Sequence, residues 1–138
     1  MLRAKRWSSR DGFSLIEAVI AIAVVAFSIF AILAANTRLQ QRAQAVFERS
    51  IALQDANQAL EQMRNTADSG TFPNNVVSAF PNNSAVPGFA NIASEQVTVS
   101  YANVTSDPLD VTVTVGWLEN GVRQVSATLR TLMTKRSP

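Results

Sequence analysis

The stretch FSLIEAVIAIAVVAFSIFAILAA, residues 13–35, decides the fold because its 23 residues carry a single charge, Glu17. A helix of this length measures roughly 34 Å at about 1.5 Å per residue, just enough to cross a hydrocarbon core of about 30 Å. Four basic residues precede it: Arg3, Lys5, Arg6 and Arg10. Because such clusters stay on the cytoplasmic side of a membrane, the remainder of the chain is predicted to project outward.

Glu17 is the first candidate functional residue. A charge near the bilayer centre costs about 2.5–3.5 kcal/mol even on the mildest insertion scale, so a carboxylate here needs a partner. Two simpler interpretations of the segment compete. A secretory signal peptide would need small residues at −3 and −1 of its cleavage site. A cut after Ala35 would instead place Leu33 at −3. A plain single-span anchor with an incidental Glu stays open.

Residues Gly12-Phe13-Ser14-Leu15-Ile16-Glu17, which follow a basic leader and begin the apolar stretch, resemble the processing signal of type IV pilins. The resemblance implies that a prepilin peptidase cuts between Gly12 and Phe13. It implies further that the new terminal Phe13 is N-methylated, and that Glu17 pairs with the terminal amine of a neighbouring subunit during assembly. The resemblance covers roughly residues 10–64. It implies an α+β fold, the type IV pilin fold, in which one long N-terminal helix packs on a small antiparallel sheet.

Two departures from the pattern of many major pilins favour a minor subunit. No Pro or Gly interrupts residues 13–66, and the chain contains no Cys for a C-terminal disulfide loop. The chain is therefore most similar to minor pilins of the PilV-like group, which help to prime or tip pilus assembly. The alternative within the class is a type II secretion pseudopilin of the I-subunit type. The implied partners are the inner membrane, prepilin peptidase, other minor pilins and the major pilin. The implied location is single-pass in the inner membrane with a periplasmic C-terminal domain, and then the pilus.

Composition argues against other classes of function. The formal charge of the chain is +2, but residues 1–12 carry +3, and their removal leaves eight basic and nine acidic residues, a net charge near −1. We therefore expect no nucleic-acid partner. With no His and no Cys, the chain lacks the usual bases, thiols and metal ligands. We expect no enzyme activity, cofactor, metal or small-molecule substrate. Three carboxylates, those of Asp107, Asp110 and Glu119, are interpreted as solvated groups near turns, too few for a calcium site.

Helical periodicity continues beyond the apolar run. Leu39, Val46, Leu53, Leu60 and Ala67 recur every seven residues, with Ala56 and Met63 beside them. This pattern predicts one helix of about 54 residues whose stripe faces a partner. A two-stranded coiled coil is one candidate partner, and the protein's own sheet, covered by Leu53, Leu60 and Met63, is the favoured one. Glu48 and Asp55 are predicted to lie largely off this stripe, and Gly70 to take the left-handed position after the last turn.

The remaining residues divide into a loop and a sheet. The predicted segments are a leader at 1–12, a transmembrane half-helix at 13–35, an amphipathic half-helix at 36–68, a loop at 69–94 and a sheet at 95–138. The loop holds two similar turns at Phe72-Pro73-Asn74-Asn75 and Phe80-Pro81-Asn82-Asn83. Its Phe72, Phe80 and Phe89 are either pinned to the domain or part of a solvated linker.

Alternation predicts three strands at residues 95–104, 109–118 and 122–133. A three-residue loop, Glu119 to Gly121, would pair Val115 with Val125 and keep one apolar face. The predicted face contains Val111, Val113, Val115, Trp117, Val125, Ala127 and Leu129. Gly121 is expected in a left-handed conformation.

Overall fold

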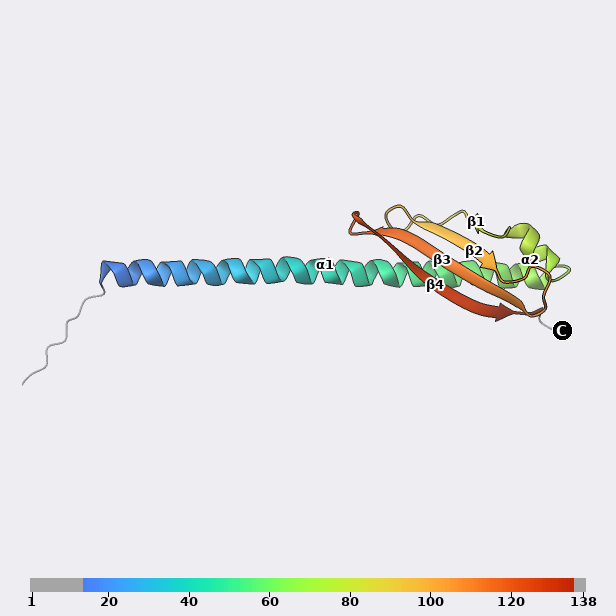
Figure 1. Cartoon of the computed structure of the whole chain (residues 1–138), viewed down its shortest axis with the longest axis horizontal. Helices are drawn as coiled ribbons and strands as arrows, with labels where there is room; N and C mark the ends of the chain where they lie inside the picture. Colours follow the sequence, from blue (N-terminus) through green and yellow to red (C-terminus); the bar gives the residue numbers. More distant parts are fainter. Residues whose placement is uncertain (1–13, 136–138) are drawn as a thin grey trace, which may run out of the picture. The chain divides into compact units, whose positions relative to one another are not determined.

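A computed structural model describes residues 14–135 of the chain (Figure 1). Its elements are α1 (Leu15–Asp68), α2 (Asn74–Ala79), β1 (Ser84–Ala85), β2 (Gln96–Tyr101), β3 (Leu109–Glu119) and β4 (Arg123–Met133). The chain divides after Gln40 into two compact units, which are described separately. The first contains the apolar beginning of α1, and the second contains the rest of α1 and every other element.

The second unit is a helix packed on a sheet. Its four strands form one antiparallel sheet in the order β1-β2-β3-β4, and one face of this sheet lies along α1 (Figure 1). The predicted α+β arrangement, a pilin-like fold with one long N-terminal helix and a small antiparallel sheet, is therefore confirmed. The helix has the predicted length of 54 residues.

The core forms between α1 and the buried face of β3 and β4. Along β3 the buried positions are Leu109, Val111, Val113, Val115 and Trp117, with partly exposed residues between them, as the period of two in a strand requires. Ala127 of β4 is buried on the same face, while Val125 and Leu129 are partly buried against the core. The apolar face predicted from the sequence is thus confirmed.

The helix meets this face mainly through small residues. The buried apolar positions of α1 are Ala52, Ala56, Ala59, Leu60, Met63 and Ala67. Of the predicted covering residues, Leu60 and Met63 are buried and Leu53 is only partly buried. The stripe is not covered along its whole length, because Leu39 is 60% exposed and Val46 70% exposed.

Two charged side chains were placed wrongly. Glu48 and Asp55 were expected off the packed face but are buried, at 7% and 3% exposure. Hydrogen bonds satisfy both: Glu48 accepts from the Asn120 backbone N–H (3.1 Å) and from Gln44 Nε2 (3.0 Å). Asp55 accepts at both carboxylate oxygens from Asn91 Nδ2 (3.1 and 3.0 Å). These contacts pin the β3–β4 turn and the loop before β2 to the helix.

The predicted strand register is wrong by two residues. Val115 pairs with Ala127 rather than Val125, and Val113 pairs with Leu129. Glu119 belongs to β3 and lies opposite Arg123, with which it forms an ion pair, so the turn comprises Asn120, Gly121 and Val122. A shift of two keeps every side chain on its face, which explains why the apolar face is correct although the pairing is not. Gly121 has the expected positive φ, 70°.

The predicted loop at 69–94 contains regular structure. The first Phe-Pro-Asn-Asn copy leads into α2, whereas the second forms a turn in which Asn83 has a φ of 58°. Asn82 Oδ1 accepts the Tyr101 N–H (3.0 Å), and β1 then pairs with β2. Phe72, Phe80 and Phe89 pack against the core, so the pinned alternative is correct. Gly70 has no positive φ; α1 ends instead with the Ser69 N–H and hydroxyl both bonding the Thr66 carbonyl.

Candidate functional site

The beginning of α1, in the first unit, exposes apolar side chains around its whole circumference. Leu15 is 84% exposed, Phe27 74% and Phe30 68%. The helix is long and apolar enough to cross a membrane, and none of its most apolar window is buried within the structure. A helix that is apolar all round is stable only inside protein or lipid. This segment therefore needs an apolar environment supplied from outside the chain.

The hydroxyl groups in this segment of α1 bond to the segment's own backbone. Ser28 Oγ donates to the Val24 carbonyl (2.8 Å), and Thr37 Oγ1 donates to the Ala34 carbonyl (3.0 Å). In hydrocarbon every such group must find its partner internally. The hydroxyls of Ser28 and Thr37 are thus compatible with burial in lipid.

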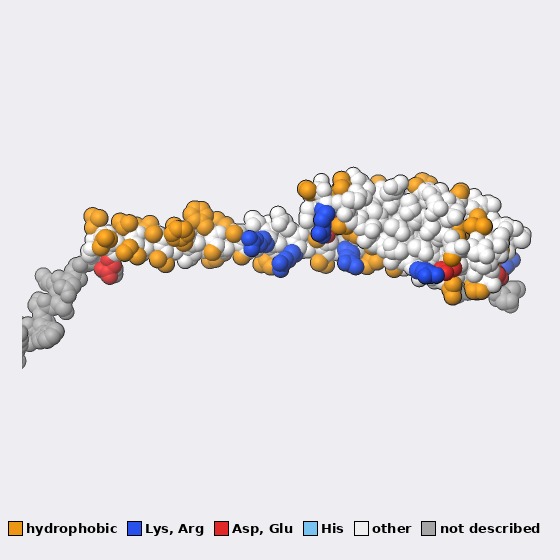
Figure 2. Space-filling view, in the orientation of Figure 1, with side chains coloured by type: hydrophobic (Ala, Val, Ile, Leu, Met, Phe, Trp, Pro, Cys, Tyr) orange, Lys and Arg blue, Asp and Glu red, His pale blue; other side chains and the backbone are white. Residues whose placement is uncertain are grey.

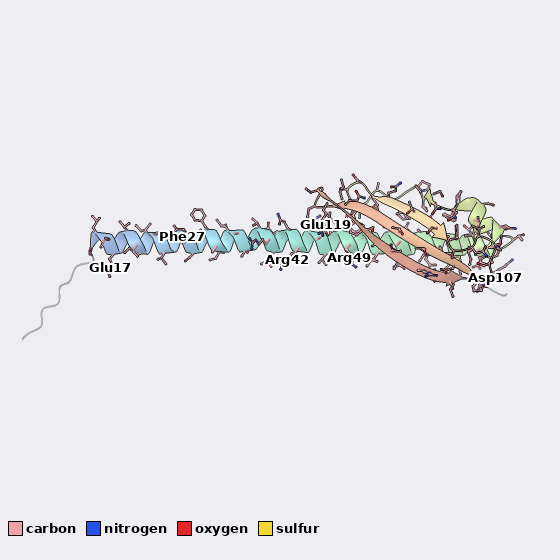
Figure 3. The ribbon with its side chains drawn as sticks, in the orientation of Figure 1. Glu17, Phe27, Arg42, Arg49, Asp107 and Glu119 are labelled. Carbon is pink, nitrogen blue, oxygen red and sulfur yellow. The ribbon has the colours of Figure 1, made fainter. Side chains whose placement is uncertain are left out.

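Glu17 is the exception. It is the only charged residue between positions 15 and 37, and it lies in the first turn of α1 (Figure 3). Figure 2 shows acidic atoms at the start of the mainly hydrophobic first part of this helix. Its backbone N–H bonds the Ser14 carbonyl (2.9 Å), and a carboxylate at a helix N-terminus is favoured by the exposed backbone N–H groups there. Among residues 14–135, however, no side-chain donor reaches the carboxylate. The position calls for a cationic partner.

The other two predicted site residues, Gly12 and Phe13, lie outside the described residues. Cleavage between them and methylation of Phe13 therefore stay predictions. Glu17 lies five residues beyond Gly12 in the sequence.

The carboxylates considered near the turns have structural partners. Asp107 accepts from Thr134 Oγ1 (2.9 Å). Asp110 accepts from Arg130 Nε (2.8 Å), and hydrogen bonding to this guanidinium lowers the pKa of the Asp110 carboxyl. Glu119 pairs with Arg123. Within the part of the chain that the structure describes, no group of three or more His, Cys, Asp or Glu side chains is arranged to hold a metal ion.

Asp55, Asn91 and Glu95 form a polar cluster that the sequence pattern does not predict. Glu95 Oε2 accepts the Asn91 N–H (2.7 Å). Its Oε1 is buried without a hydrogen-bond partner among the described residues. Burial, and then the nearby Asp55, raises the pKa of the Glu95 carboxyl. The cluster fastens the loop before β2 to α1, and the seven-residue spacing of Glu48 and Asp55 was the one signal that could have placed both on a common face.

Comparison with known proteins identified no relative of this chain. No family model matches the chain, and neither a curated protein nor a solved structure is detectably similar to it. The fold and the isolated carboxylate therefore carry the functional argument.

Proposed function

We propose that the chain is a minor pilin that helps to prime or tip a type IV pilus. The observation that carries the proposal is Glu17, a single carboxylate in the first turn of a helix whose most apolar window is not buried in the structure. The same helix continues into a unit where it packs on a small antiparallel sheet. Such a chain combines a membrane-spanning segment with a folded head.

The proposed assembly step is an ion pair between two subunits. After cleavage at Gly12, the N-methylated amine of Phe13 carries a positive charge next to the apolar run. Within one chain a helix places Phe13 and Glu17 about 6 Å apart along its axis, so a direct pair is strained. A neighbouring subunit shifted along the filament brings its own amine to Glu17 and neutralises two desolvated charges at once.

The proposed location and partners follow from this step. Basic residues before the apolar run keep the N-terminus in the cytoplasm, so the head lies in the periplasm until the subunit enters the pilus. Prepilin peptidase, other minor pilins and the major pilin are the partners. The function needs no catalysis, cofactor or small-molecule substrate, and the near-neutral mature chain offers no basis for nucleic-acid binding.

Mass spectrometry of the mature N-terminus tests the proposal. In cells with an active prepilin peptidase, the protein should begin at N-methylated Phe13. Gly12→Val should leave it uncleaved, because a larger side chain crowds the peptidase site. A wild-type protein that still begins at Met1 in such cells would show that the chain is a plain anchor and not a pilin.

A further inference from the structure

The second unit carries an exposed basic stripe on α1, which we define as Arg42, Val46 and Arg49. The two arginines are seven residues apart, or about 10.5 Å along the axis and within about 20° around it. Figure 3 shows them along the same side of the helix. Val46 lies between them and is 70% exposed. Among residues 14–135 neither guanidinium has a carboxylate within ion-pair distance.

The same unit carries an acidic groove where the last turns of α1 meet the end of β4. Its lining residues are Glu61, Arg64, Asn65, Asp68, Leu132, Met133 and Thr134. Glu61 and Asp68 are exposed and again seven residues apart. Leu132, which is 66% exposed, supplies an apolar wall. The groove lies beside an edge strand, since β4 pairs only with β3.

We propose that the basic stripe of one copy of this chain docks in the acidic groove of a second copy. The two surfaces match in charge and in spacing, because each carries its charges seven residues apart with an exposed apolar side chain beside them. A shift of 19 positions along α1 places Arg42 opposite Glu61 and, simultaneously, Arg49 opposite Asp68. The same shift, about 29 Å at the standard rise, places Val46 opposite Asn65 and beside Leu132.

The contact uses different surfaces on its two partners, so a docked pair keeps one free stripe and one free groove at its two ends. Such head-to-tail contacts with an axial shift do not close and extend into filaments. The parallel orientation rests on the proposed function, in which all copies in one filament point the same way. Two copies related by this shift are not the pair that brings an amine to Glu17, because that pair needs a shift of about four residues. An antiparallel pairing of the same charges would instead give a closed dimer.

One existing ion pair competes with docking. Arg64 pairs with Glu61 one turn away, and both side chains are largely exposed, at 51% and 60%. Such a surface pair contributes little, and a carboxylate accepts more than one guanidinium hydrogen. Arg42 can therefore join Glu61 without displacing Arg64, while Asp68 has no ion pair among the described residues.

A charge exchange in the full-length protein tests the proposal. One variant carries Arg42→Glu and Arg49→Glu, and the other carries Glu61→Lys and Asp68→Lys. Each alone places like charges opposite one another, so the concentration for half-association in detergent should rise about tenfold or more relative to wild type. An equimolar mixture should restore association, because each variant's stripe then meets an opposite charge. Restoration also shows that both variants are folded.

A wild-type protein that stays monomeric at every concentration, or a mixture that associates no better than its components, would overturn the proposal. Added salt provides a second readout. Exposed charge pairs are screened beyond about 3 Å in 1 M salt, so the advantage of the mixture over its components should shrink.

Cysteine pairs test the geometry, since the natural chain contains no Cys. Val46→Cys with Leu132→Cys should give a ladder of disulfide-linked oligomers on oxidation. The matched control is Phe47→Cys with Leu132→Cys: Phe47 is similarly exposed, at 60%, but points about 100° away around the helix. A band limited to dimers would overturn the open head-to-tail arrangement, and cross-linking no stronger than the control would overturn the register. Neither assay depends on leader cleavage, so an uncleaved chain that associates would refute the pilin assignment and leave the contact standing.

Discussion

Truncation of Leu60 tests the helix–sheet packing most directly. Leu60 is 5% exposed and belongs to the core formed by α1 and the inner face of β3 and β4. Leu60→Ala removes three carbons and leaves a cavity that the packed alanines around it cannot fill. Replacement of a buried Leu by Ala costs about 2–5 kcal/mol, a large part of the 5–15 kcal/mol that stabilises a typical domain.

The same helix offers a matched control. Leu39 lies on the same seven-residue stripe but is 60% exposed, so Leu39→Ala creates no cavity in the sheet-packed core. We expect it to change the stability of the second unit by less than about 0.5 kcal/mol, as is usual for exposed positions.

The assay is urea unfolding of the full chain in detergent, followed by tryptophan fluorescence. The chain has two tryptophans, and Trp117 is the one in the sheet, at 2% exposure. With Trp7→Phe in the full chain, Trp117 alone reports on the unfolding of the sheet. A loss below about 0.5 kcal/mol for Leu60→Ala, equal to that of the Leu39 control, would show that this face of α1 is not packed on the sheet.

Three other perturbations have defined outcomes. Glu17→Ala should be inserted and cleaved normally, but it should not co-purify with partner minor pilins, and the number of surface pili should fall. Glu17→Gln should have the same defects because it lacks the charge. Wild-type piliation in either variant would refute the proposed pair. The single tyrosine, Tyr101, should titrate with a pKa of about 12 when followed by ultraviolet absorbance, because burial raises the pKa from 10. The folded state then keeps the tyrosine proton to higher pH than the unfolded state. The contribution of Tyr101 to the free energy of unfolding should therefore be complete below pH 10 and be lost between pH 10 and 12. Glu48→Ala should speed hydrogen exchange of the Asn120 amide about tenfold or more, since a hydrogen bond to a charged acceptor contributes about 1.5–3 kcal/mol, whereas Glu48→Gln, which keeps an acceptor, should change it less.

The spacing of apolar residues predicted the fold because burial of one face imposes a period of about 3.6 residues on a helix and of two on a strand. A strand that buries one face must alternate, and this rule located β2, β3 and β4 and the apolar face of the sheet. The rule is blind to a shift of two residues, so it could not choose between Val125 and Ala127 as the partner of Val115. In the observed register the turn comprises Asn120, Gly121 and Val122, and Glu119 lies opposite Arg123.

The helix face was predicted less well because large side chains were taken as the signal. Close approach of a helix to a sheet instead favours small residues, and Ala52, Ala56 and Ala59 are fully buried. Once the alanines define the face, Glu48 and Asp55 necessarily point toward the sheet as well. Backbone and amide donors from other segments satisfy both carboxylates there, and contacts between segments so far apart in the sequence cannot be predicted from a local pattern.

The polar side chains in the apolar beginning of α1 differ in whether their own helix can satisfy their hydrogen bonds. The hydroxyls of Ser28 and Thr37 donate hydrogen bonds to backbone carbonyls of their own helix. These two side chains therefore need no partner from another chain in lipid. Glu17 cannot be satisfied in this way, because a carboxylate has no proton to donate to a carbonyl, and among residues 14–135 no side-chain donor reaches it. An isolated chain keeps Glu17 at modest cost only near the hydrated rim of the membrane. In the assembly proposed above, Glu17 would leave this rim and become buried between helices, where an unpaired charge costs about 3–5 kcal/mol. The amine of another subunit would remove that penalty, so under this proposal Glu17 favours a subunit arrangement that brings the amine to it.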